Sequence, residues 1–350
     1  AVPYRRRPAG LVFLPGGDRR FSHTRPPGYT RHMDSRTVTL KAVDRLSPPR
    51  TPLYFCNRDF GESDVVNVTY APAAGFVPSV PGMTEWGFVW EVLDGTMGQP
   101  KTHPLADAGA LATYRPPDAA APGRFDGVEA EIAQWPGRFI KFSLGITGFN
   151  QATFLRGYSA FLEDLFEVPD RAGAVLDFVF DFETEIIRRA LEYPVDAVSF
   201  GDDWGTQQGL MIAPELWRDV FRPRYAAQFD LIRRAGKKVW FHSCGNVHAM
   251  LGDLIDIGAD VVELLQPDVM GVDRLARDFG GKVCFCCSVD HQRRAIHDGR
   301  EAILDYARRL RDTLGGAGGG FIGYVEDYAC LGMSEENYQH VREAFHALNR

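Results

Sequence analysis

From residue 33 onward, short apolar runs alternate with longer stretches in which apolar residues recur every three or four positions. The first pattern is typical of buried strands and the second of amphipathic helices. Strands are predicted at 51–56, 138–145, 196–201, 239–241, 259–265, 283–289 and 320–325. Helices are predicted at 37–45, 154–165, 172–193, 214–235, 247–256, 270–279, 300–313 and 335–348.

Residues 65–121 are less regular, being rich in proline, glycine and aromatic residues, and we expect excursions around one further strand there. With it the chain has about eight strands separated by helices, which favours a single (β/α)8 TIM barrel over an open doubly wound sheet. No Gly-x-Gly-x-x-Gly motif follows the first strand, which counts against dinucleotide binding. We therefore predict one barrel catalytic domain over residues 33–350.

Composition adds limits on compartment and partners. The chain is 45% apolar and 24% charged, as in proteins with a sizeable core. No apolar run approaches the ~20 residues needed to cross a bilayer. The six cysteines are unevenly spaced, unlike a secreted disulfide framework. We expect a cytoplasmic protein whose thiols are reduced and which does not act at a membrane.

Residues 1–32 differ from the rest in charge. They hold seven arginines and one acidic residue, whereas the whole chain carries a formal net charge of −7. We expect Met33 to be the natural start and residues 1–32 to be a disordered or non-native extension. The alternative is a basic arm for nucleic acid, but the acidic body argues against a nucleic-acid partner.

The strand at 239–241 leads into His242-Ser-Cys-Gly-Asn246. Residues two apart in a strand share a face, so the imidazole of His242 and the thiol of Cys244 would project together. Such a pair is half of a zinc site. Gly245 would allow the chain to turn, and Asn246 could cap the next helix. The alternative is a histidine and a thiol packed in the core.

A barrel would gather polar residues at one rim, because catalytic groups lie at the carboxyl ends of its strands. Each of these residues could instead be an ordinary solvated loop residue. The rim residues are Asn57, Arg58, Asp59, Asn150, Gln151, Asp202, Asp203, His242, Cys244, Glu263, Gln266, Cys286, Cys287, Asp290, Glu326, Asp327 and Cys330. Strand alternation puts Cys284 and Cys286 on one face and Cys287 on the other. We expect these three thiols to pack as small apolar groups, the alternative being that Cys286 or Cys287 joins the site.

The segment from Phe200 to Asn337 resembles the uroporphyrinogen decarboxylase superfamily, and most closely its zinc-dependent corrinoid methyltransferase branch. The resemblance rests on Gly201-Asp-Asp-Trp-Gly-Thr-Gln207, Pro214-Glu-Leu-Trp-Arg-Asp-Val-Phe-Arg-Pro223, His242-Ser-Cys-Gly-Asn246, Ile255-Asp-Ile-Gly-Ala-Asp260, Leu265-Gln-Pro267, Val289-Asp-His-Gln292 and Cys330 ahead of Glu336-Asn337. Members of the superfamily have a (β/α)8 barrel, so the resemblance implies the same fold as the strand count.

The resemblance implies that His242, Cys244 and Cys330 bind Zn²⁺ and that an acidic fourth ligand is exchangeable. For this ligand we favour Glu263, with Asp203 and Glu326 as competitors, and we expect Asp203 and Glu263 to be catalytic. Further polar residues at the rim are expected to bind the substrate. They are Asn57, Arg58, Asn150, Gln207, Asn246 and Gln266.

The activity implied by the resemblance is methyl transfer, either from a methylcobamide to a thiol or folate acceptor or from a small-molecule methyl donor to a reduced corrinoid. Zinc would stabilise the acceptor thiolate at neutral pH. The chain lacks the corrinoid-binding sequence Asp-x-His-x-x-Gly, so cobalamin would arrive on a partner corrinoid protein. Homodimers are common in the superfamily.

Two other functions remain open. One is a decarboxylase-like lyase that uses Asp203 and Arg58 on a carboxylated substrate. Against it, residues 57–62 do not match the early Arg-x-x-Gly-Arg sequence of the decarboxylases. The other is a binding protein that has kept the barrel and lost turnover.

Overall fold

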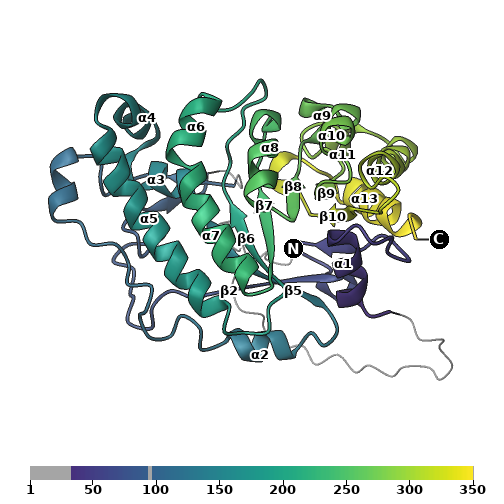
Figure 1. Cartoon of the computed structure of the whole chain (residues 1–350), viewed down its shortest axis with the longest axis horizontal. Helices are drawn as coiled ribbons and strands as arrows, with labels where there is room; N and C mark the ends of the chain where they lie inside the picture. Colours follow the sequence, from purple (N-terminus) through teal and green to yellow (C-terminus); the bar gives the residue numbers. More distant parts are fainter. Residues whose placement is uncertain (1–32, 94–96, 350) are drawn as a thin grey trace, which may run out of the picture.

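The structure, a computed structural model, describes residues 33–93 and 97–349. The predictions for residues 1–32 lie outside the described residues. Eight parallel strands form one sheet in the order β1-β10-β9-β8-β7-β6-β5-β2 (Figure 1). They are β1 (Leu53–Phe55), β2 (Val65–Thr69), β5 (Phe139–Ile146), β6 (Ala197–Gly201), β7 (Lys238–His242), β8 (Val261–Leu264), β9 (Cys284–Ser288) and β10 (Phe321–Val325).

The two edges of this sheet meet, because the backbone nitrogen of Asp64, next to β2, donates to the oxygen of Leu53 in β1 at 2.7 Å. Helices surround the nearly closed barrel, which confirms the predicted (β/α)8 fold. They are α1 (Ser35–Val43), α2 (Val128–Ala133), α3 (Gly148–Arg156), α4 (Tyr158–Glu167), α5 (Pro169–Ala190), α6 (Pro214–Val220), α7 (Arg222–Arg234), α8 (His248–Ile257), α9 (Pro267–Met270), α10 (Val272–Phe279), α11 (Arg294–His297), α12 (Arg300–Leu314) and α13 (Glu335–Ala347).

Two helices predicted as single elements, 154–165 and 214–235, are broken in the structure. Gly157, with φ of 90°, separates α3 from α4, and Gly271, with φ of 83°, separates α9 from α10. A positive φ is costly for other residues, so each glycine marks a true break in the chain direction. The predicted helix 214–235 divides at Phe221, just before Pro223. Between β2 and α2 lies a small antiparallel ribbon of β3 (Trp90–Glu91) and β4 (Gln99–Pro100).

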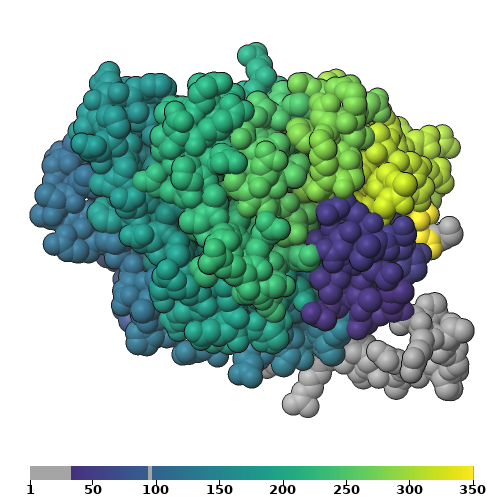
Figure 2. Space-filling view, viewed as in Figure 1, coloured from purple at the N-terminus to yellow at the C-terminus, as the bar shows by residue number. Residues whose placement is uncertain are grey.

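Helix α1 covers the amino-terminal end of the barrel. Its Arg36 pairs with Asp196, just before β6, at 2.7 Å, and Asp44 after the helix pairs with Lys238, the first residue of β7, at 2.5 Å. Figure 2 shows these N-terminal residues, in purple, against the yellow C-terminal part of the chain. With this end closed, the carboxyl ends of the strands form the accessible mouth.

The barrel interior is not purely apolar. The strand registers place Lys141 of β5, Trp240 of β7 and Glu263 of β8 on the inward face. Tyr54 of β1 meets Trp240 from across the barrel, with ring centroids 6.0 Å apart. None of the described helices combines the length and the apolarity that a bilayer-spanning segment needs.

Candidate metal site at the barrel mouth

Strand β7 and the turn after it position two of the predicted ligands. Val239, Trp240 and Phe241 are buried, and His242 is the last residue of the strand. Gly245 has φ of 79°, and a Cβ at this position would collide with the carbonyl of Gly205. The turn therefore packs directly on the backbone of the loop after β6. This close approach requires glycine at position 245.

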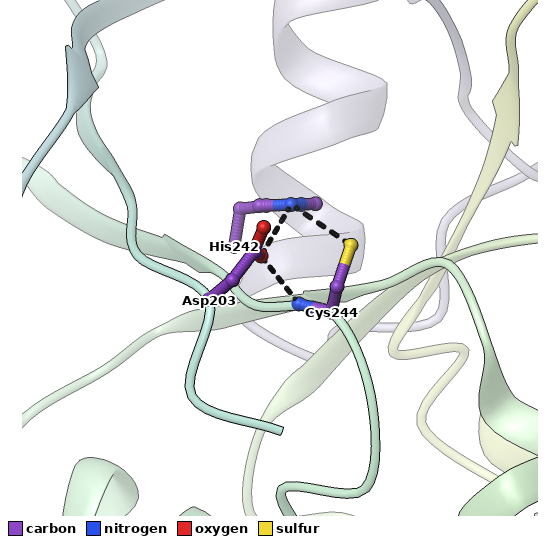
Figure 3. Close-up of side chains that lie close together, drawn as sticks. All are labelled: Asp203, His242 and Cys244. Atoms are coloured by element: carbon purple, nitrogen blue, oxygen red, sulfur yellow. Dashed lines mark hydrogen bonds and ion pairs between the residues drawn. The ribbon is translucent and has the colours of Figure 1, made fainter. Parts of the chain in front are cut away.

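The loop after β6 adds a third metal-binding side chain. Asp203 Oδ1 accepts from the backbone nitrogen of Cys244 at 2.7 Å and lies 3.4 Å from His242 Nε2. Cys244 Sγ lies 3.6 Å from the same Nε2 atom. One ligand atom from each of the three residues lies within 4.8 Å of the others, and the three side chains point toward one another (Figure 3). The predicted pairing of His242 with Cys244 is thus present.

Glu263 lies behind His242 and not beside Cys244. Its Oε1 lies 3.0 Å from His242 Nδ1, and its Oε2 accepts from Trp240 Nε1 at 2.6 Å. Lys141 Nζ lies 3.4 Å from the same Oε2, between the rings of Tyr54 and Trp240. A carboxylate that holds one ring nitrogen leaves the other nitrogen, Nε2, directed at a metal. The geometry therefore favours Asp203 over Glu263 as the acidic ligand.

The charges of these groups depend on one another. Burial alone would raise the pKa of Glu263, but Lys141 and the hydrogen bonds from His242 and Trp240 lower it to about 2. Burial also acts against ionisation of Asp203, yet the hydrogen bond from His242 lowers its pKa. Burial raises the pKa of the Cys244 thiol to about 11. Without a cation, Cys244 is therefore a neutral thiol beside the ionised carboxylate of Asp203.

The structure places Cys330 apart from this group. Cys330 lies in the short 3-10 helix η3 (Ala329–Leu331) after β10, and its sulfur is not in the cluster of ligand atoms within 4.8 Å. Glu326 is not in the cluster either, and its Oε2 accepts from Tyr324 at 2.6 Å. Cys286 and Cys287 are fully buried in β9, as their expected packing role requires.

Two of the predicted substrate-binding residues form structural ties at the mouth. Asn57 exchanges two hydrogen bonds of 2.9 Å with the backbone of Asp327. Arg58 pairs with Asp327 and Glu335, each at 2.9 Å. Both residues thus bind the loop after β1 to the segment after β10.

The other predicted substrate-binding residues lie around the metal-binding group. Gln207 Nε2 donates to Gln266 Oε1 at 3.2 Å. The backbone nitrogen of Asn150 donates to Asp202 at 2.8 Å. Asn246 Nδ2 donates to the Val269 oxygen at 3.4 Å, and Asn246 Oδ1 accepts from the backbone nitrogen of His248, the first residue of α8, at 3.4 Å, although the N-cap position itself is Val247.

Three residues in or next to the site were not predicted from the sequence: Lys141 and Trp240 in the barrel interior and His291 after β9. Lys141 had a visible signal, since it is the one charged residue inside the apolar run at 139–146. A buried lysine in a barrel strand needs a carboxylate partner, and Glu263 is that partner. His291 follows β9, and its Nε2 lies 3.1 Å from Gln266 Nε2.

The donor set at the mouth suits zinc. An imidazole nitrogen, a thiol sulfur and a carboxylate oxygen are the ligands of catalytic zinc sites, which have three protein ligands and one open position. Binding a cation here would displace the Cys244 proton, because a thiolate is the binding form. Asp203, His242 and Cys244 could thus hold a zinc ion at the barrel mouth.

The fold and site define a (β/α)8 barrel in which an aspartate, a histidine and a cysteine that could hold a metal ion lie together at the carboxyl ends of the strands. Residues 131–348 match the family model described as Uroporphyrinogen decarboxylase (URO-D), so the chain belongs to this family. A methyltransferase from Methanosarcina mazei has a similar fold, with a TM-score of 0.64 at 13% identity. The alignment covers 90% of this chain and 99% of that chain. No curated protein matches the chain.

Proposed function

We propose that this protein is a zinc-dependent methyltransferase that moves a methyl group between a corrinoid and a small molecule bound at the barrel mouth. The observation that carries the proposal is the convergence of Asp203, His242 and Cys244. A bound zinc ion would supply Lewis acidity, which favours the thiolate of a thiol acceptor at neutral pH. The fold shared with a methyltransferase agrees with this activity.

The residues of the chain have distinct roles in this proposal. His242, Cys244 and Asp203 hold the metal, and Glu263 orients the imidazole through Nδ1. Lys141 balances the charge of Glu263, so the buried carboxylate stays ionised. In the thiol-acceptor direction, the sulfur forms a bond to the methyl group, its proton goes to solvent, and the cobalamin substrate leaves as cob(I)alamin.

Several parts of the proposal concern partners and location. We propose that a separate corrinoid protein presents the cobamide at the mouth, because the chain has no Asp-x-His-x-x-Gly sequence. A cytoplasmic location is proposed because the six cysteines are not spaced like a secreted disulfide framework, and a homodimer because homodimers are common in the superfamily. The lyase alternative gains nothing from the geometry, because Arg58 is already paired with Asp327 and Glu335.

The first test is metal content after purification without chelator. We expect about one zinc ion per wild-type chain and none in His242→Ala. In Glu263→Gln, which keeps the size of the side chain, we expect the affinity for zinc to fall by about 10- to 100-fold. The control is His346→Ala, which removes a histidine of α13 that pairs with Glu62. Asp203→Asn and Cys330→Ala identify the third ligand. Protein that stays free of zinc after incubation with the ion would refute the proposal.

Activity is then measured as methyl transfer from free methylcobalamin to small thiols under anaerobic conditions. The spectrum of cob(I)alamin reports the reaction. We expect turnover by zinc-loaded wild type and His346→Ala and none by His242→Ala. Zinc-loaded protein that turns over no thiol and methylates no cob(I)alamin from an oxygen or nitrogen donor would leave a metal site without this activity.

A further inference from the structure

A chain of hydrogen bonds beside the metal-binding group starts at a backbone donor. The backbone nitrogen of Gly245 donates to Gln266 Oε1 at 3.1 Å. A backbone N–H can only donate, so this side-chain atom must be the amide oxygen of Gln266. Gln207 Nε2 donates to the same oxygen at 3.2 Å. The orientation of the Gln266 amide is therefore fixed by two donors.

The fixed amide determines the tautomer of His291. Gln266 Nε2 must donate, and it lies 3.1 Å from His291 Nε2, which must then accept. In a neutral imidazole that accepts through Nε2, the proton is on Nδ1. His291 is only 5% exposed, and its Nδ1 atom is buried without a hydrogen-bond partner among the described residues. An N–H donor buried without a partner needs an explanation.

The position of His291 suggests an explanation for its unpartnered Nδ1–H. The residue follows β9, between Gln266 after β8 and Tyr328 after β10, whose ring centroid is 4.7 Å from that of His291. Burial and, to a smaller extent, the charge of His242 lower the pKa of His291 to about 4, while Asp203 opposes this. His291 is thus a neutral imidazole within electrostatic range of the metal-binding residues.

We propose that His291 Nδ1–H binds an uncharged acceptor oxygen of the small molecule that occupies the barrel mouth. This proposal rests on the proposed function for its statement that a small molecule binds beside the metal. The oxygen belongs to a carbonyl, ether or hydroxyl group. A carboxylate fits poorly, because the neutral N–H of His291 brings no positive charge to compensate a buried anion.

The competing explanation is that His291 only holds Gln266, and through it the turn that carries Cys244. Two variants separate these roles, because glutamine places a polar atom near Nε2 of histidine and asparagine places one near Nδ1. His291→Gln keeps the acceptor for Gln266 and loses the Nδ1 donor. His291→Asn keeps a donor near Nδ1 and loses the contact with Gln266.

The experiment is ¹⁵N NMR on protein labelled at histidine, with and without zinc. The probes are anisole, acetophenone and cyclohexanol, which carry an ether, a carbonyl and a hydroxyl oxygen, beside ethylbenzene, with no acceptor, and benzoate, an anion. We expect His291 to be protonated on Nδ1 and this proton to shift with at least one oxygen probe but not with ethylbenzene or benzoate. His291→Gln should lower the affinity for that probe about fivefold, and His291→Asn should lower it less. The zinc content of His291→Gln should stay unchanged.

Three results would overturn the proposal. They are protonation of His291 on Nε2, no shift of the Nδ1 proton with any oxygen probe, and a loss of zinc in His291→Gln that matches the loss of probe binding. The third result would establish a positioning role. Failure of the wild type to bind zinc refutes the proposed function separately, because the probe titration is also made on zinc-free protein.

Discussion

Replacing Lys141 with methionine tests the electrostatic account of the barrel interior. Lys141 and Glu263 are each 6% exposed, with Nζ and Oε2 3.4 Å apart. Methionine keeps most of the length and apolar surface of lysine, so the main change is loss of the positive charge. The carboxylate would then be buried beside Trp240 and His242 without its ammonium partner.

The pKa of Glu263 sets the size of the expected effect. Its fall from the ordinary value of 4.5 to about 2, to which Lys141 contributes together with His242 and Trp240, corresponds to about 3 kcal/mol, at about 1.4 kcal/mol per pH unit. Two charges 3.4 Å apart in an effective dielectric of about 20 attract by about 5 kcal/mol. Removing one partner of a buried pair typically costs about 3–5 kcal/mol. We expect Lys141→Met to lower the free energy of unfolding by this amount at pH 7.

The sign of the pH dependence follows from the depressed pKa of Glu263. A carboxyl with a lowered folded-state pKa contributes stability that is present above its ordinary value and lost as the pH falls. The stability that Glu263 provides is therefore complete above pH 4.5 and disappears toward pH 2. The difference between wild type and Lys141→Met should narrow over the same interval.

Urea unfolding followed by tryptophan fluorescence measures the effect. The matched control is Lys101→Met, because Lys101 pairs with Glu91 at the surface. This variant should lose less than about 1 kcal/mol of its free energy of unfolding. The double variant Lys141→Met, Glu263→Gln should recover part of the loss, because it removes the uncompensated charge. If Lys141→Met costs no more than Lys101→Met, or the double variant recovers nothing, the reasoning is wrong.

Two further predictions concern a buried acid and a glycine. Burial raises the pKa of Glu183 to about 7, so folded protein retains a proton that unfolded protein releases, and stability should fall by about 3 kcal/mol as the pH rises from 4.5 to 7. Glu183→Gln should remove this fall, measured as urea midpoints at pH 5 and 8; an unchanged fall would contradict it. Gly245→Ala should abolish zinc binding, because its Cβ would meet Gly205. Gly236→Ala, at φ of 71° in open space, should retain zinc and lose only about 1–3 kcal/mol of stability; equal zinc content in both alanine variants would refute the account.

The sequence predicted the barrel because most strands are continuous apolar runs bounded by turn residues. Strand β7 and strand β10 lie where these runs predicted them. Strand β2 (Val65–Thr69) was not separated from the irregular residues that follow it, because five residues carry little periodic signal beside a long excursion. The broken helices were missed because α-helical periodicity continues across Gly157 and Phe221, although the chain direction changes there.

Only the part of the site that lies within one segment of the chain could be predicted from the sequence. The spacing of His242 and Cys244 determined that they would lie together, since this depends on one strand. The choice between Asp203 and Glu263 depended on other strands. Trp240 and Lys141 occupy one oxygen of Glu263 and His242 the other, while the packing of Gly205 on Gly245 brings Asp203 to Cys244. Such contacts cannot be read from the spacing of any single segment.

The position of Cys330 links these arguments to the metal. A site formed by Asp203, His242 and Cys244 needs only the loops after two neighbouring strands, which are already in contact. A site that includes Cys330 needs the segment after β10 to approach β7, and Asn57 and Arg58 tie that segment to the loop after β1. If those ties break, the free energy lost with them would have to be supplied by the zinc–thiolate bond. How readily Cys330 enters the site therefore depends on the ties between the segment after β10 and the loop after β1, and not on the strand that carries His242.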